Sequence, residues 1–291
     1  MINNLIILAG GASSRMKKES TLKGLSEKAV RQANTRNKGL IEIGEKNTPF
    51  LHYLLHNAKT AGYLNIYIVI AEKDDLFQAV YGKNEVNNSY KGLTISFVRQ
   101  HIVNGRSKPQ GTADALYQAL EQYPILTKSS FVVCNCDNLY STKVFTALKK
   151  VNSRNALIGY DREGLNFSSE RIGKFALMKI DEDGYLMDII EKPSPEEALS
   201  YQDEFGKLRV SMNIFKFDGS LFYPFLKNCP IHPERDEKEL PTALLKMIRE
   251  KDYNVKVIPI SEHVIDLTSK DDISIVEKYL KKNYPVGLKW E

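Results

Sequence analysis

Residues 5–16 read LIILAGGASSRM, an apolar run that gives way at once to glycines, serines and an arginine. Such a run followed by a Gly-Gly pair is typical of a buried strand, here residues 5–9, that ends in a tight turn. Further predicted strands cover residues 66–71, 93–99 and 131–136, and predicted helices cover residues 49–61, 112–122 and 142–151. This alternation predicts an α/β fold, a three-layer αβα mixed sheet that is mainly parallel.

Residues 151–291 have a different pattern, rich in short β segments. Predicted strands cover residues 174–180, 185–191, 208–217 and 255–260, with Asp183-Gly184 as a hairpin turn, and predicted helices cover residues 240–251 and 271–281. No linker rich in proline, glycine or serine separates this part from residues 1–150. We therefore expect one domain, residues 1–291, with a β-rich second portion.

Composition excludes several classes of protein. Hydrophobic residues make up 42% of the 291 and charged residues 26%, as in ordinary globular proteins, and the net charge of +5 suits anionic, phosphorylated substrates without proving them. The basic residues do not alternate with aromatic ones, so no nucleic-acid partner is expected. No apolar run approaches the roughly 20 residues that span a bilayer. Cys134, Cys136 and Cys229 fit no zinc pattern, and we expect reduced thiols in a cytoplasmic protein with no membrane partner.

The turn that follows the first strand has the chemistry of a phosphate site. Gly10 and Gly11 allow backbone N–H groups to approach phosphate oxygens closely, and Ser13 and Ser14 add hydroxyl donors. Arg15 adds a planar guanidinium suited to phosphate. The turn matches neither the dinucleotide fingerprint nor the Walker A loop. Taken alone, it leaves a phosphate site and a merely structural turn equally open.

A second chemical signal is the strand 131–136, which ends directly before Asp137. Because ligands of open α/β sheets bind outside the carboxyl ends of the strands, this carboxylate is expected at the ligand-binding edge.

Three segments occur in an order that resembles the sugar-nucleotide pyrophosphorylase family, the sugar-phosphate nucleotidylyltransferases. They are the turn at residues 8–16, the segment NKGLIEIG at residues 37–44, and PFLHY at residues 49–53. Family members have a Gly-Gly-x-Gly/Ser-Thr/Ser-Arg turn, a lysine before Leu-x-x-Ile-Gly, and a proline that opens a helix. Here Gly39 replaces the usual proline, and the spacer between Arg15 and Lys38 is longer than in the family, so Lys23 competes with Lys38 for the lysine role.

Further segments extend the resemblance over nearly the whole chain. Gln110-Gly111-Thr112 resembles the base-recognition loop, with Thr112 expected to cap the next helix. Asp137-Asn138 resembles the Gly-Asp-Asn motif, with Cys136 in place of the glycine. The more distal matches are Gly173, Glu191-Lys192-Pro193, Asn213, Glu239 and Asp266, the last in a context that departs from the family's Trp-x-Asp-x-Gly-Thr.

The resemblance implies a Rossmann-like, glycosyltransferase-A-like fold that joins a nucleoside triphosphate to a sugar 1-phosphate and releases pyrophosphate. Residues 1–150 would form the nucleotide-binding portion and residues 151–291 the sugar-phosphate-binding portion. The implied catalytic residues are Arg15, Lys38 and Lys192, and the implied metal ligands, for Mg²⁺, are Asp137 and Asp266. The implied nucleotide contacts are Leu8, Ala9, Gly10, Gly11, Ser13, Ser14, Gln110, Gly111, Thr112 and Asn138. The implied sugar-phosphate contacts are Gly173, Glu191, Lys192 and Asn213.

Several alternatives stay open. The segment at residues 111–115 resembles adenylyl-transferring members and Asp137-Asn138 resembles thymidylyl- and uridylyl-transferring ones, with a pyrimidine weakly favoured. The chain could instead be a catalytically inactive relative that senses nucleotide or sugar phosphate, or a transferase for a non-sugar alcohol phosphate. The basic stretch at residues 17–37 is a solvated loop with a short helix, or a basic flap over the phosphate site. A homo-oligomer is left open.

Overall fold

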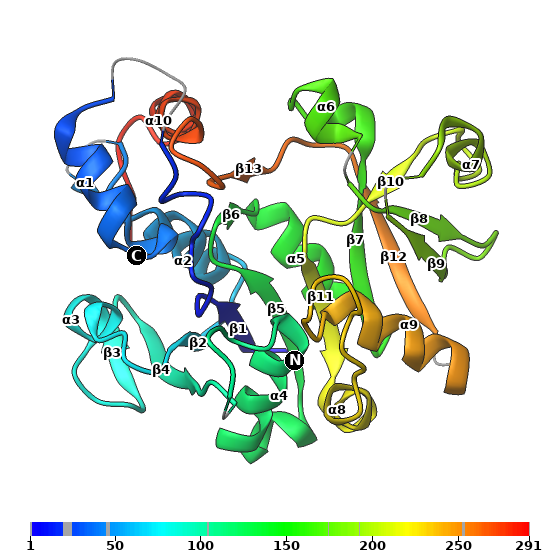
Figure 1. The fold of residues 1–291 in the computed structure, drawn as a ribbon, viewed down its shortest axis with the longest axis horizontal. Helices are drawn as coiled ribbons and strands as arrows, with labels where there is room; N and C mark the ends of the chain where they lie inside the picture. Colours follow the sequence, from blue (N-terminus) through cyan, green and yellow to red (C-terminus); the bar gives the residue numbers. More distant parts are fainter. Residues whose placement is uncertain are drawn as a thin grey trace. The chain divides into compact units, whose positions relative to one another are not determined.

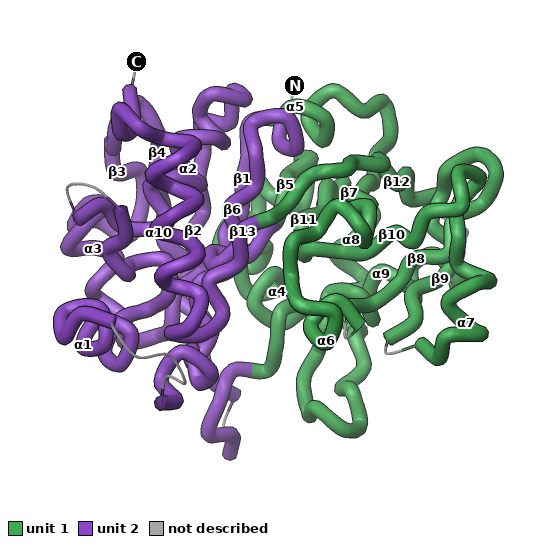
Figure 2. Tube along the Cα trace, turned by 90° about the horizontal axis from the view of Figure 1, so that it is seen from above, with its two compact units in different colours: residues 1–2, 110–133, 146–264 green, residues 3–109, 134–145, 265–291 purple. Residues whose placement is uncertain are grey.

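The computed structural model describes residues 2–19, 25–44, 47–103, 105–173, 175–191, 193–251 and 254–290. These form two compact units (Figure 2). Unit 2 comprises residues 3–109, 134–145 and 265–291, and unit 1 comprises residues 1–2, 110–133 and 146–264. None of the helices in the described part of the chain combines the length and apolar character that crossing a bilayer requires.

Unit 2 is built on a parallel sheet in the order β4-β2-β1, with β3 antiparallel to β4 at the edge (Figure 1). Its strands are β1 (Asn4–Leu8), β2 (Asn65–Ala71), β3 (Asn88–Tyr90), β4 (Leu93–Gln100), the end of β5 (Ser130–Asn135), and a separate antiparallel pair, β6 (Asn138–Leu139) and β13 (Ile265–Asp266). The β1–β2 register runs from Asn4 opposite Asn65 to Leu8 opposite Val69. Beyond β1 lies the end of β5, where the Cys136 N–H donates to the Leu8 carbonyl at 3.2 Å.

Helices of unit 2 flank this sheet, and α2 (Phe50–Thr60) in particular buries an apolar face. They are α1 (Glu27–Thr35), η1 (Lys38–Leu40), α2 (Phe50–Thr60), α3 (Leu76–Tyr81), the start of α5 (Thr142–Lys150) and α10 (Asp272–Asn283). In α2, Phe50, Leu51, Leu54 and Leu55 are fully buried, at the i, i+1, i+4, i+5 spacing of one helix face. The short helix expected within residues 17–37 is α1, while residues 20–24 of that stretch, including Lys23, lie outside the described residues.

Unit 1 is organised around β7 (Asn155–Asp161), a strand buried at every position. It pairs in parallel with β12 (Val255–Ile260) and antiparallel with β11 (Ile214–Asp218) and β10 (Arg209–Val210). β10 also pairs antiparallel with β8 (Leu177–Ile180). β8 and β9 (Leu186–Ile190) form an antiparallel hairpin. The hairpin turn is at Gly184, φ 76°, as the sequence predicts.

Helices of unit 1 are α4 (Thr112–Gln122), η3 (Pro124–Lys128), the end of α5, η4 (Arg162–Gly164), α6 (Ser169–Ile172), α7 (Pro195–Leu199), α8 (Gly219–Lys227) and α9 (Leu240–Lys251). α8 packs against α4 and α9. Its Phe222 ring stacks on Phe217 with the centroids 3.7 Å apart.

The predicted mixed sheet flanked by helices is confirmed, with the parallel strands concentrated in unit 2 and the antiparallel ones in unit 1. The single strand expected at residues 208–217 is wrong: it is two strands, β10 and β11, because Asn213 between them has a left-handed φ of 56° that interrupts the extended backbone.

Candidate active site

The glycine turn after β1 presents open backbone. The Ala9 N–H still donates to the β2 residue Val69 at 2.8 Å, which keeps the turn in register with the sheet. Gly10 is buried, whereas Gly11 is exposed, and a Cβ added to Gly11 would meet no atom within 4 Å. The chain therefore offers an uncovered peptide segment at the carboxyl edge of the sheet.

Beyond these glycines the chain turns back on itself. Ser13 has a left-handed φ of 53°, and its carbonyl accepts the Lys17 N–H at 3.2 Å. Ser14 and Arg15 are exposed and Met16 is buried, so Met16 anchors the turn while the hydroxyl and guanidinium groups stay accessible. An anion at this turn could be met by backbone amides, a hydroxyl and a planar cation.

Lys38 and Asp137, 99 residues apart in the sequence, form an ion pair. The Lys38 Nζ lies 2.8 Å from the Asp137 Oδ2, and their side chains are only 10% and 20% exposed. Lys38 begins η1, whose N-cap is Asn37. The fold thus holds a cation against the carboxylate that the sequence analysis places at the ligand-binding edge.

Asp266 lies beside Asp137 through the β6–β13 pair. Asp266 is opposite Asn138 in the ladder, and the Leu267 N–H donates to the Asp137 carbonyl at 2.8 Å. Strand rise and antiparallel spacing put the Asp137 and Asp266 Cα atoms roughly 6 Å apart. One Asp266 oxygen accepts the Thr268 hydroxyl at 2.6 Å. The backbone segments that carry these two carboxylates, distant in the sequence, are therefore neighbours.

Asn138, the implied nucleotide contact, is buried at 4% exposure. Its Oδ1 lies 3.4 Å from the Tyr140 hydroxyl, which donates to it. Cys136, which stands where the family has glycine, is also buried. Burial is the larger cause, and the negative charge of nearby Asp137 the smaller one, that raises the pKa of its thiol to about 12. All three cysteines are free and buried, and the thiol of Cys136 is protonated at neutral pH.

Gly111 in unit 1 is required by packing. Its φ is 108°, and a Cβ there would lie 2.4 Å from the Lys238 carbonyl oxygen. The neighbouring Gln110 carbonyl accepts the Lys238 N–H, and the Ala113 N–H donates to the Lys238 carbonyl at 2.9 Å. The loop and the start of α4 are thereby joined to the segment before α9.

The expectation that Thr112 caps α4 is wrong. The N-cap is Gly111, and no side chain caps the helix. The Thr112 hydroxyl instead accepts the Leu240 N–H at 3.0 Å, because the start of α9 lies within its reach.

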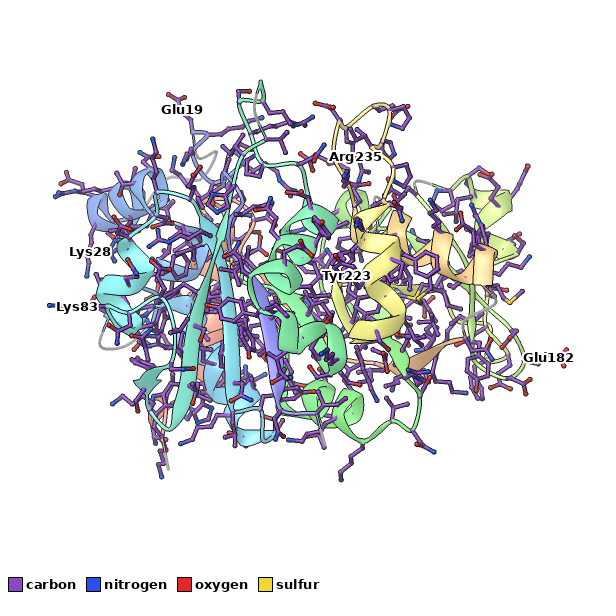
Figure 3. The ribbon with its side chains drawn as sticks, turned by 90° about the horizontal axis from the view of Figure 1, so that it is seen from below. Glu19, Lys28, Lys83, Glu182, Tyr223 and Arg235 are labelled. Atoms are coloured by element: carbon purple, nitrogen blue, oxygen red, sulfur yellow. The ribbon has the colours of Figure 1, made fainter. Side chains whose placement is uncertain are left out.

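Glu191 is part of a short ionic chain. Arg235 donates to a Glu191 oxygen and also to Glu239 Oε1 at 2.6 Å (Figure 3 labels Arg235). Since Glu239 follows Lys238, this chain connects the Gly111 loop to Glu191 within unit 1. Lys192, the implied ligand of the sugar phosphate, lies outside the described residues.

Gly173 and Asn213, the remaining sugar-phosphate candidates, are both exposed and lie on other segments of unit 1. Gly173 ends α6 as its C-cap. Asn213 precedes β11 in a left-handed conformation, with its N–H donating to the Ser211 hydroxyl at 3.2 Å.

Two residues that sequence reasoning missed connect the candidates. Asn37 joins the Lys38 turn to the glycine turn, and Arg235 joins Glu191 to Glu239. Asn37 had a local signal, because asparagine is a favoured N-cap. Arg235 had none, since its partner Glu191 is 44 residues away.

The carboxylate oxygens of Asp137 and Asp266 are of the type that a divalent cation binds. Mg²⁺ takes oxygen ligands and commonly binds one or two carboxylates together with substrate phosphates. Asp137 and Asp266 provide such oxygens, and the Lys38 ammonium already shows that a cation is accommodated beside Asp137. Within the described ranges, no group of three or more histidine, cysteine, aspartate or glutamate side chains is placed to hold a metal ion.

Comparisons with known proteins show the family and the fold. A family model described as nucleotidyl transferase matches residues 4–282. A solved structure of UDP-glucose pyrophosphorylase complexed with UDP-glucose aligns with a TM-score of 0.68 at 16% identity, covering 97% of this chain and all of that one. At that identity the likeness shows a shared fold.

Two relatives in sequence are glucose-1-phosphate adenylyltransferases by name. Glucose-1-phosphate adenylyltransferase 1 of Vibrio cholerae is 24% identical over 214 residues, which are 72% of this chain and 48% of that protein. Glucose-1-phosphate adenylyltransferase of Aliivibrio fischeri (strain MJ11) is 25% identical over 303 residues, with 98% of this chain and 69% of that protein covered. The chain spans about half the length of the first relative.

Proposed function

Since the chain belongs to the nucleotidyl transferase family, we propose that it joins a nucleoside triphosphate to a sugar 1-phosphate, giving an NDP-sugar and pyrophosphate. The observation that carries the proposal is the Lys38–Asp137 ion pair, held beside Asp266 and next to the strand that ends in the glycine turn. Attack of a sugar-phosphate oxygen on the α-phosphorus, with pyrophosphate leaving in line, needs positioning and charge neutralisation more than covalent help.

At the triphosphate end, the exposed Arg15 and the backbone amides of Gly10 and Gly11 bind phosphate oxygens, assisted by Ser13 and Ser14. Leu8 and Ala9 are proposed as neighbouring nucleotide contacts, with the Ala9 N–H already bonded to Val69 in the sheet. Lys38 leaves Asp137 to neutralise the charge that builds on the leaving pyrophosphate. No side chain has to remove a proton, because a sugar phosphate is already ionised at neutral pH.

Mg²⁺ is the cofactor we propose, held by Asp137 and Asp266. When bound it neutralises phosphate charge and aligns the attacking and leaving oxygens. The support from the chain is that the backbone segments of Asp137 and Asp266, 129 residues apart in sequence (266 − 137), are neighbours and that a lysine is paired with Asp137. The support for this cofactor is the oxygen-only donor set and the family membership.

At the sugar end, Glu191, Gly173 and Asn213 contact the sugar and Lys192 orients its phosphate. Glu191 must then release Arg235, or share it, when hydroxyl groups of the sugar arrive. An arginine so placed, still paired with Glu239, keeps a positive charge beside the Glu191 carboxylate.

The base is contacted by Gln110, Gly111, Thr112 and Asn138, and a pyrimidine stays weakly favoured. The relatives in sequence are adenylyltransferases by name, which supports adenine as the first competitor. Their names also make glucose 1-phosphate the first sugar to test. We further propose a cytoplasmic location, consistent with three free buried thiols, and a homo-oligomer stays open.

The test is a matrix of five nucleoside triphosphates against common sugar 1-phosphates with Mg²⁺, read as pyrophosphate release and NDP-sugar formation. Turnover with at least one pair supports the proposal. Tight triphosphate binding without turnover would identify a catalytically inactive sensor. The departures from the family pattern at Gly39 and Cys136 are the reason to test for this alternative. Turnover with non-sugar alcohol phosphates alone, included as a further row, would identify the other rival.

A further inference from the structure

The side chain of Asn37 touches three segments of the candidate site at once. Its Nδ2 donates to the Ala9 carbonyl at 2.5 Å, next to the glycine turn. Its Oδ1 accepts the Gly39 N–H at 3.1 Å, which caps the turn of Lys38. The same oxygen accepts the Cys136 thiol at 3.6 Å, directly before Asp137. One amide therefore connects the phosphate turn, the lysine and the metal carboxylate.

The segment that carries Asn37 and Lys38 is itself held by α1. Gln32, buried to 6% exposure, accepts the Glu42 N–H at 2.8 Å and donates to its carboxylate at 3.1 Å. Arg36 and Lys28 each lie 2.8 Å from the same carboxylate (Figure 3 labels Lys28). Contacts at Glu42 on one side of Lys38 and at Asn37 on the other therefore hold this segment in place.

We propose that Asn37 is a positioning residue for the reaction, an inference that rests on the proposed function. The C=O and N–H of a trans peptide point in opposite directions, so fixing the Ala9 carbonyl on Asn37 directs the Gly10 N–H away from Asn37. The same side chain fixes the start of the Lys38 turn and the residue before Asp137. Asn37 does not touch substrate; it sets the relative positions of groups that do.

Two variants separate positioning from folding. Asn37→Ala removes all three contacts, whereas Asn37→Asp keeps an acceptor for Gly39 and Cys136, replaces the donor to Ala9 by a second acceptor oxygen and adds a negative charge. Asn34→Ala is the matched control, because Asn34 is an exposed asparagine of α1 in the same segment. Each protein is assayed for kcat, for KM of the triphosphate, and for the rate at which iodoacetamide alkylates Cys136, read by peptide mass spectrometry with Cys229 as internal reference.

The expected results differ between the variants. Both Asn37 variants lose about 10- to 100-fold in kcat, the range seen when supporting partners of ligand residues are removed, with a smaller change in KM. Cys136 alkylation becomes about fivefold faster in Asn37→Ala, as loss of one hydrogen bond predicts, and is no faster than in the wild type in Asn37→Asp, whose carboxylate still accepts the thiol. Asn34→Ala matches the wild type in all three measurements.

Two results would overturn the proposal, and each is distinct from failure of the proposed function. A kcat of Asn37→Asp or Asn37→Ala equal to that of Asn34→Ala removes the positioning role. Unchanged Cys136 alkylation in Asn37→Ala shows that the three-way contact does not hold the site. If the wild type releases no pyrophosphate with any substrate pair, the proposed function fails, and the alkylation rates alone decide whether Asn37 organises the site.

Discussion

Replacing Glu42 by glutamine should destabilise the protein near neutral pH, because the Glu42 carboxylate is where α1 is bound to the segment carrying Lys38. Lys28 above all, and then Arg36 and Gln32, lower its pKa from 4.5 to about 2, although burial opposes the shift. Glutamine keeps the size of the side chain and an acceptor for Gln32, so the variant removes mainly the charge.

The structure bounds the size of this effect. Each pKa unit corresponds to 1.36 kcal/mol, so the full displacement gives an upper limit of about 3.4 kcal/mol. The Lys28 and Arg36 side chains are 56% and 37% exposed, and exposed ion pairs contribute only about 0.2–1 kcal/mol each. We expect a loss of ~1–2 kcal/mol in the free energy of unfolding, or a Tm lower by roughly 2–4 °C.

The lowered pKa of Glu42 determines in which direction its stabilising contribution changes with pH. A carboxyl whose pKa is depressed in the folded state contributes its full stabilisation above its unfolded value of 4.5 and loses it as the pH falls towards 2. Urea unfolding of the wild type and Glu42→Gln at pH 7 and at pH 3 should show the difference shrinking at the lower pH. Glu182→Gln, in an exposed turn, is the control. A deficit no larger than that of Glu182→Gln at pH 7, or one that persists undiminished at pH 3, would refute the reasoning.

The other predictions concern the site. Asp137→Asn should leave the fold intact and lower turnover by at least about 10²-fold, by analogy with lost oxyanion donors, and a variant with more than about a tenth of the wild-type rate would contradict the metal assignment. Lys192→Ala should mainly raise KM for the sugar phosphate, and steady-state kinetics with a defect confined to the triphosphate would count against that role. Gly111→Ala should lower stability by more than ~1 kcal/mol, since its Cβ would lie 2.4 Å from the Lys238 oxygen at a φ of 108°, and an unchanged Tm would contradict this. EDTA should stop pyrophosphate release and added Mg²⁺ should restore it; full activity in EDTA would exclude the proposed cofactor.

Elements with strong local patterns were predictable. The first strand, the helix Thr112–Gln122 and the strand Val255–Ile260 lie within one residue of their expected bounds, because their apolar periodicity coincides with burial in the fold. The position of Asp137 after β5 follows from strand order alone.

Other elements were missed because tertiary packing overrides local preference. β7 is buried on both faces and carries Gly159, so it lacks the alternation that marks a half-buried strand. α8 begins at Gly219 and contains Pro224, both unfavourable in helices, yet Phe222 stacks on Phe217 and α8 packs between its neighbours. Neither stabilising contact is visible in the segment's own residues.

The site candidates divide in the same way. The resemblance made Lys38, Asp137 and Asp266 candidates, but no local pattern could indicate that Lys38 and Asp137 form an ion pair across 99 residues. The predicted helix cap at Thr112 is wrong, because its hydroxyl accepts a hydrogen bond from the N–H of Leu240, which is distant in sequence. The roles of the individual residues stay predictions.

The ion pair between Lys38 and Asp137 has a consequence for the order in which ligands load. A carboxylate with its own internal counter-ion has little net charge to attract a bare divalent cation from solution. An anionic polyphosphate that draws the ammonium group to itself would uncover that charge at the moment of its arrival. Affinity for the metal should therefore be weak in the free protein and should rise with triphosphate concentration, and by linkage the triphosphate should bind more tightly when the metal is present.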